Sequence, residues 1–95
     1  MNDEKYVEKK LCKAVRNVGG LALKLVSPGF DGIPDRLILI AYGRMAFVEV
    51  KAPGEKPRPL QVARINKLRN MGFKVFVLND VKNIPAIIDS IKGGD

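Results

Sequence analysis

The sequence contains no histidine, a single cysteine and no long apolar run, and each absence narrows the possible chemistry. Without histidine there can be no Ser-His-Asp triad, no Cys-His dyad and no His-ligated metal site. The lone Cys12 excludes an internal disulfide and a cysteine-based zinc site, and its helix-periodic neighbours indicate a reduced, buried thiol. No segment approaches the roughly 18–20 apolar residues of a membrane span. Any catalysis must therefore depend on carboxylates and on Lys or Arg, with or without a hard metal ion.

The chain does contain an excess of basic residues. Its 95 residues suffice for one hydrophobic core, so we expect a single domain over residues 1–95. Seventeen Lys and Arg against ten Asp and Glu give a net charge of +7, which favours a polyanionic partner such as nucleic acid. The alternative is a basic protein with no such partner. The charged start of the chain leads into no apolar segment, so we expect no signal peptide, no membrane association and a cytoplasmic location.

The hydrophobic periodicity predicts an α/β domain with the element order α-β-β-β-α-β-α. Helices are predicted over residues 4–18, 60–71 and 84–91, and strands over 21–26, 37–42, 45–51 and 73–78. Residues 43–44 are short enough for a hairpin turn, whereas three prolines exclude regular structure from 52–59. The first three strands suggest an antiparallel meander, and the strand-helix-strand unit after them suggests a right-handed crossover to a parallel neighbour. The expected fold is a mixed β-sheet flanked by helices.

Two charged residues end the predicted strand 45–51. Residues two apart on a strand point to the same face, so Glu49 and Lys51 project together while Val50 points into the opposite layer. Taken alone, this pattern is also typical of a solvent-facing ion pair at a strand end, which contributes little to stability.

Asp35 favours a functional interpretation of this pair. It precedes the neighbouring strand, so a hairpin between the two strands would place it beside Glu49 and Lys51. Two converging carboxylates are costly unless a cation lies between them. Oxygen ligands suit Mg²⁺ or Mn²⁺, and the Val50 carbonyl could add another ligand. Such a site could hydrolyse a phosphodiester, with Lys51 steadying the attacking water or the developing negative charge.

Three short segments together resemble the PD-(D/E)xK nuclease superfamily and, more narrowly, the VRR-NUC family in its small standalone bacteriophage form. They are Gly32-Ile33-Pro34-Asp35, Glu49-Val50-Lys51, and Gln61 at the start of a helix. The resemblance spans residues 7 to about 78 and includes the order of the elements. The resemblance implies that residues 1–95 form a single VRR-NUC-like nuclease domain and that this domain has a restriction-endonuclease-like core.

The resemblance also implies a role for each matching residue. Asp35, Glu49 and the Val50 carbonyl would bind Mg²⁺ or Mn²⁺, and Lys51 would be the catalytic lysine. Gln61 matches the glutamine that lies near the site in the family. The alternative for Gln61 is a polar residue that caps its helix.

A further acidic ligand is implied on the first helix. Glu8 matches a family position that can reach the metal region, through water, although Glu4 is its neighbour at helical spacing. The alternative for Glu8 is a place on a solvated helix face. The basic residues Lys56, Arg58 and Arg64 flank the predicted site, and we expect them to contact DNA phosphates.

Aromatic residues number six and are scattered through the predicted strands, which indicates no stacking platform for single strands. Tyr42 and Phe30 are the candidates adjacent to loops, and core packing is expected for Phe30.

The family resemblance implies a metal-dependent DNA endonuclease that leaves a 5′-phosphate and a 3′-hydroxyl. Phage members suggest that the substrate is branched DNA, such as a four-way (Holliday) junction, cut by a homodimer with twofold symmetry. The apolar positions of the last helix are a candidate dimer interface, with core packing as the alternative: Ile84, Ile87, Ile88 and Ile91. Two other functions stay open, a nuclease acting on simple duplex DNA and a non-catalytic nucleic-acid-binding module with the same fold.

Overall fold

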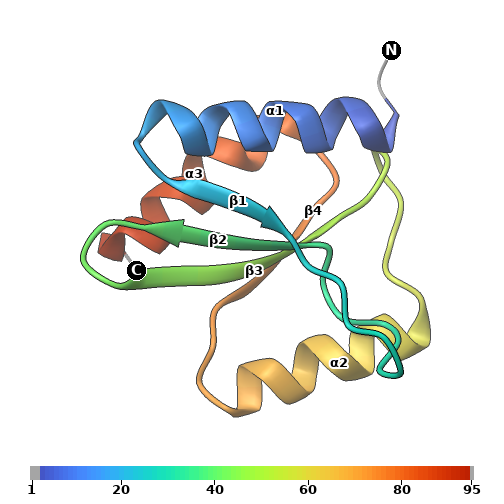
Figure 1. Cartoon of the computed structure of the whole chain (residues 1–95). Coiled ribbons are helices and arrows are strands. Elements are labelled where there is room, and N and C mark those ends of the chain that lie inside the picture. Colours follow the sequence, from blue (N-terminus) through green and yellow to red (C-terminus); the bar gives the residue numbers. More distant parts are fainter. Residues whose placement is uncertain (1–2, 95) are drawn as a thin grey trace.

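The computed structural model describes residues 3–94 and places four strands in one mixed sheet with helices on both faces (Figure 1). The strands are β1 (Leu21–Lys24), β2 (Arg36–Ile40), β3 (Arg44–Val50) and β4 (Val75–Leu78). Their order in the sheet is β1-β2-β3-β4, with antiparallel pairing in the first two pairs and parallel pairing between β3 and β4. The helix α2 (Pro59–Asn70) forms the crossover between the parallel strands. This confirms the predicted mixed sheet and the element order.

The first helix, α1 (Glu4–Asn17), begins where the Asp3 side chain accepts a hydrogen bond from the backbone N–H of Tyr6. Its buried residues Val7, Leu11 and Val15 recur at every fourth position and face the sheet. The chain then enters β1 through Gly20, where a Cβ atom would lie 2.7 Å from the Leu39 carbonyl oxygen. A glycine at this position lets the end of α1 pack directly against β2.

The last helices complete the layer that contains α1. A short 3-10 turn (Val81–Asn83) leads into α3 (Ile84–Asp89), which continues as a π-helical segment (Ser90–Gly94). In Figure 1, α1 and α3 lie on one side of the sheet and α2 lies on the other. The four isoleucines of the last helix are buried in the hydrophobic core between α1, α3 and the sheet. They therefore cannot form the dimer interface considered from the sequence, because the chain's own first helix and sheet cover them.

The opposite side of the sheet is only partly covered. Ala22 packs against the core, so Leu21 and Leu23 point away from α1 and are 57% and 43% exposed. The strand register places them beside Leu39 and Leu37. Because α2 packs chiefly against β4, this surface, which we call the open face (Leu21, Leu23, Leu37 and Leu39), remains accessible at its β1 edge.

Two further expectations about burial were wrong. Phe30 is 45% exposed rather than part of the core, since its loop lies beyond the sheet and against α2. Cys12 is half-buried, because it lies beside rather than within the row of α1 residues that faces the sheet. Within residues 3–94, no helix combines the length and apolar character needed to cross a bilayer.

Candidate active site

Asp35 and the end of β3 lie together, as the hairpin prediction required. Arg36 pairs with Val48, so extending the register by one pair places Asp35 opposite Glu49. The Asp35 carboxylate accepts a hydrogen bond from the backbone N–H of Val50 at 3.0 Å. The Asp35 carbonyl accepts another from the N–H of Leu25 at 2.8 Å. The end of β3 and the residue that follows β1 therefore hold Asp35 in position.

Glu49 is a buried carboxylate, with its side chain only 1% exposed. Its Oε2 atom accepts a hydrogen bond from Gln61 Nε2 at 2.8 Å and forms an ion pair with Lys51 Nζ at 3.3 Å. Its Oε1 atom is buried and has no hydrogen-bond partner among the described residues. An unpartnered buried carboxylate oxygen is costly, so this atom is the one that a cation could satisfy.

The electrostatics of the site oppose ionisation of Glu49. Burial raises the pKa of the Glu49 carboxyl above its ordinary value, and the negative charge of Asp35 raises it further. Lys51 acts in the other direction but does not cancel these effects. The two carboxylates therefore repel each other in a poorly solvated position, which is the situation that a bound divalent cation would relieve.

Lys51 lies at the boundary between the sheet and the solvent. Its backbone N–H donates to the Leu78 carbonyl at 2.9 Å, which continues the parallel pairing of β3 with β4. Its side chain is 15% exposed, on the same face as Glu49. The pair is therefore not the solvent-facing ion pair that the sequence pattern alone allowed, because Glu49 is fully enclosed.

Gln61 links Glu49 to the start of α2 and combines both roles considered for it. Its Oε1 atom accepts a hydrogen bond from the backbone N–H of Arg58 at 2.8 Å, while its Nε2 atom donates to Glu49. The loop before Asp35 packs against the same helical turn. At Gly32, where φ is +86°, a Cβ atom would lie 2.8 Å from Leu60 Cγ. A glycine is needed there to bring Asp35 close to α2.

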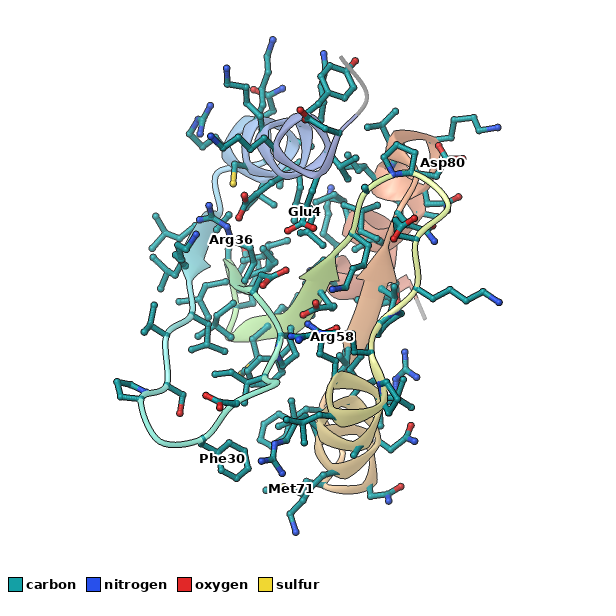
Figure 2. All side chains as sticks on the ribbon, turned by 90° about the vertical axis from the view of Figure 1, so that its right-hand side faces the viewer. Glu4, Phe30, Arg36, Arg58, Met71 and Asp80 are labelled. Atoms are coloured by element: carbon teal, nitrogen blue, oxygen red, sulfur yellow. The ribbon has the colours of Figure 1, made fainter. Side chains whose placement is uncertain are left out.

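The two acidic residues of α1 have different surroundings. Glu8 Oε2 accepts a hydrogen bond from Arg36 Nε at 2.9 Å, and Arg36 Nη1 also donates to the Ala22 carbonyl at 3.1 Å. Arg36 is a structural residue that sequence reasoning missed, although its place directly after Asp35 could have signalled it. The charge of Glu4, in contrast, contributes to the raised pKa of Glu49. Figure 2 shows Glu4 on the side of α1 that faces the sheet.

The basic residues predicted to contact DNA lie at the start of α2 and in the loop before it. Lys56 and Arg58 are exposed. Figure 2, which looks onto the side where β2 begins and β3 ends, shows Arg58 between α2 and these strands. Arg64 is half-buried, donates to the Asp31 carbonyl at 2.8 Å and stacks on the Phe30 ring, 3.8 Å from its centroid.

The donor set fits a hard divalent cation that keeps several water ligands. Among residues 3–94, no three His, Cys, Asp or Glu side chains lie close enough to hold a metal ion. The candidate site thus offers two carboxylates, those of Asp35 and Glu49. This number is sufficient for Mg²⁺, which typically binds through one or two carboxylates together with waters and substrate oxygens. The free Oε1 atom of Glu49 is the structural feature that supports this fit.

The chain belongs to the VRR-NUC domain family, and a mixed sheet with a pair of carboxylates and a lysine at one edge is the class of architecture described above. The family matches residues 2–82. A solved structure of a VRR-NUC domain superimposes with a TM-score of 0.88 at 33% sequence identity, covering 94% of this chain and 97% of that one. Among individual proteins, the chain is similar to "Putative nuclease p44" of Acyrthosiphon pisum secondary endosymbiont phage 1. The two are 44% identical over 88 residues, which are 93% of this chain and 94% of the phage protein.

Proposed function

We propose that this protein is a metal-dependent endonuclease that hydrolyses DNA phosphodiester bonds to leave a 5′-phosphate and a 3′-hydroxyl. The observation that carries the proposal is the buried Glu49 Oε1 atom, which has no hydrogen-bond partner in the part of the chain that the structure describes and belongs to a carboxylate near Asp35, on a chain of net charge +7. Membership of the VRR-NUC family and the name of the phage relative support the same activity. A protein that only bound DNA would gain nothing from two carboxylates near the phosphates.

Each residue of the site has a separate task in this proposal. Asp35 and Glu49 would hold Mg²⁺ or Mn²⁺, with the Val50 carbonyl as a further ligand. When bound, such a cation neutralises phosphoryl oxygens and helps a water molecule to lose its proton. Lys51 would donate hydrogen bonds to the attacking water or to the developing negative charge. Gln61 occupies Glu49 Oε2, which leaves Oε1 as the oxygen available to the cation.

Glu8 has a supporting task in the same proposal. Its carboxylate is bound by Arg36, so we assign it to holding α1 against β2 next to Asp35. Glu4 faces the sheet and influences Glu49 through its charge, so it is the α1 carboxylate that could reach the metal region through water.

DNA would bind through phosphate contacts made by Lys56, Arg58 and Arg64 around the start of α2. Such contacts give affinity without reading the base sequence. A chain of 95 residues has little surface for base contacts, so we propose that selection depends on DNA shape, with branched DNA as the substrate. Such an enzyme would act in the cytoplasm of the host cell.

A comparison of DNA substrates tests both parts of the proposal, metal-dependent cleavage and selectivity for branched DNA. We expect cleavage of a labelled four-way junction and of flap DNA to require Mg²⁺ or Mn²⁺ and to exceed cleavage of linear duplex DNA of the same sequence by at least about tenfold. The measurement is the initial rate on each substrate with and without EDTA. Equal rates on junction and duplex would leave a simple duplex nuclease, whereas tight binding without cleavage under either metal would favour the binding module.

We propose a second copy of the chain as the partner of the open face. A twofold dimer uses the same surface of both subunits, and it would direct two active sites at the two strands of a symmetric junction. The open face is apolar and lies on the same side of the sheet as Glu49, since Leu37 and Asp35 alternate with the core-facing residues of β2.

The oligomeric state checks this assignment. Replacing both Leu21 and Leu23 by glutamate is expected to convert a dimer into a folded monomer in sedimentation experiments. Val62→Glu is the control, because Val62 is 41% exposed on α2 and outside the open face. A wild-type protein that sediments as a monomer at micromolar concentration would exclude a stable dimer. A double variant that remains dimeric would show that the open face is not the dimer interface.

A further inference from the structure

An apolar pocket lies between α2 and the loop that leads to Asp35. Its volume is about 110 Å³, and it is lined by Phe30, Ile33, Arg64, Lys67, Leu68 and Met71. Phe30 is 45% exposed and Met71 is 63% exposed, so two large apolar side chains at this pocket are left in contact with water. An exposed apolar site beside cationic side chains is suited to a flat, largely apolar group that carries a negative charge nearby.

Arg64 holds the Phe30 ring in place. The guanidinium lies 3.8 Å from the ring centroid, and its Nε atom is fixed by the Asp31 carbonyl at 2.8 Å. This contact covers part of the ring and restrains its orientation, while nearly half of the side chain stays accessible. Arg64 and Lys67 also place two positive charges beside the apolar surface. Aromatic and cationic groups arranged in this way are what stacking of a base and contact with its phosphate require.

The pocket lies on the same side of the molecule as the candidate active site. Gln61, which contacts Glu49, is on the same helix as Arg64, about 5 Å away along the helix axis, and Met71 caps the end of that helix, about 15 Å away. Figure 2 looks onto the side of the molecule where β2 begins and β3 ends. Phe30 and Met71 lie at the bottom of this view, α1 lies at the top, and Arg58 lies between them. A strand of DNA advances about 3.4 Å per stacked nucleotide, so the pocket is a few nucleotides from the position of the reacting phosphate.

We propose that this pocket binds one unpaired nucleobase of the DNA substrate, with Phe30 as the stacking residue. The inference rests on the proposed function, and it names the feature of branched DNA that the protein recognises. A base inside a continuous duplex is stacked on both sides and paired, so bringing it into a small concave pocket is costly, whereas a base at a branch point has lost a stacking neighbour or its pairing partner and can enter at a lower cost. Phe30 is thus a specificity residue for branched DNA.

Binding measurements in EDTA test the proposal without requiring cleavage. The probes are a flap DNA and a four-way junction that carry 2-aminopurine at the branch point, and a linear duplex with the same label. We expect Phe30→Ala to raise the Kd for branched DNA by about tenfold and to remove the fluorescence change that accompanies wild-type binding. The Kd for linear duplex should change by less than about twofold. Phe30→Trp should preserve both signals, because it retains a stacking surface.

Tyr42→Ala is the matched control. Tyr42 is also exposed and also stacks with an arginine, Arg44, but it lies in the β2–β3 turn at the other end of these strands. We expect it to leave both Kd values unchanged. Equal loss of affinity for branched and linear DNA in Phe30→Ala would overturn the proposal, as would an unchanged Kd or a change from dimer to monomer. If Phe30 behaves as expected but no metal supports cleavage, the nuclease proposal fails while the base-binding pocket stands.

Discussion

Replacing Lys51 by alanine is expected to slow DNA cleavage by about a hundred- to a thousandfold, while the protein folds and binds DNA nearly as before. Lys51 is the one lysine that contacts the carboxylate pair among residues 3–94, through its ion pair with Glu49 Oε2. Its removal takes away the cationic donor proposed to stabilise the developing charge. It also removes the group that lowers the pKa of Glu49, so cleavage that remains should require a higher pH.

The rate of junction cleavage at saturating Mg²⁺ or Mn²⁺, measured from pH 6 to 9, checks this expectation. Lys82→Ala is the control, since Lys82 also pairs with a carboxylate, that of Asp80, but is 83% exposed and distant in sequence from the site. It should retain the wild-type rate at every pH. A Lys51→Ala variant that fails to fold would instead assign Lys51 to stability, and one that cleaves at the wild-type rate would remove it from the catalytic site.

Replacing Glu49 by glutamine is expected to reduce metal-dependent cleavage at least about a thousandfold and, in the absence of metal, to stabilise the fold at neutral pH. The first effect follows from the loss of the carboxylate oxygen Oε1, which has no hydrogen-bond partner among the described residues and is therefore available to a cation. The second follows from the raised pKa of Glu49, since burial and the Asp35 charge penalise its ionised form. A neutral amide of nearly the same shape avoids this penalty, and its oxygen can still accept from Gln61.

The pH dependence distinguishes this effect from a general gain in packing. Between the ordinary pKa of a glutamate, 4.5, and the raised pKa of Glu49, the folded state binds more protons than the unfolded state. The stability contributed by this group therefore falls as the pH rises through that window, and the full cost is present above it. The advantage of Glu49→Gln should accordingly be largest at pH 7–8 and disappear below about pH 4.

Thermal unfolding in EDTA over this pH range, repeated with excess Mg²⁺, provides the measurement. Wild-type protein should gain stability from Mg²⁺, because binding to the folded state alone raises the free energy of unfolding. The Glu49→Gln variant should gain no stability from Mg²⁺, because it lacks the carboxylate proposed to bind the cation. Glu55→Gln serves as the control, since Glu55 is exposed in the loop after β3 and should leave both behaviours unchanged. An advantage of Glu49→Gln that is the same at pH 4 and pH 8 would refute the electrostatic explanation.

Much of the fold could be predicted because it depends on local patterns. The four-residue repeat of Val7, Leu11 and Val15 defines the buried side of α1, and the alternation along β3 places Glu49 and Lys51 on one face. The turn between these strands proved to be residues 41–43 rather than 43–44, since Ile40 pairs with Arg44, and this register brings Asp35 opposite Glu49. These relations involve neighbours in sequence or consecutive strands, so periodicity is sufficient to find them.

Other features were decided by packing between segments that are distant in sequence. The pattern of Ile84, Ile87, Ile88 and Ile91 shows an apolar helix face but not its partner, which proved to be the chain's own core. The pairing of Glu8 with Arg36 and the exposure of Phe30 likewise depend on how α1 and α2 are placed against the sheet. Hydrophobic periodicity cannot predict such contacts, because it describes one segment at a time, whereas these contacts form only when the helices pack against the sheet.

The sequence by itself therefore determined the class of chemistry available to this protein. The absence of histidine, the basic charge and the positions of Asp35, Glu49 and Lys51 on adjacent strand ends leave carboxylates and a lysine as the reactive groups. Only the tertiary structure decided that Glu49 is enclosed, that Gln61 binds one of its oxygens and that the other oxygen has no hydrogen-bond partner within residues 3–94. The physical reason is that Glu49 is buried where segments distant in sequence meet, with Gln61 of α2 against the end of β3, and this burial raises the pKa of Glu49 in a way that no local pattern encodes.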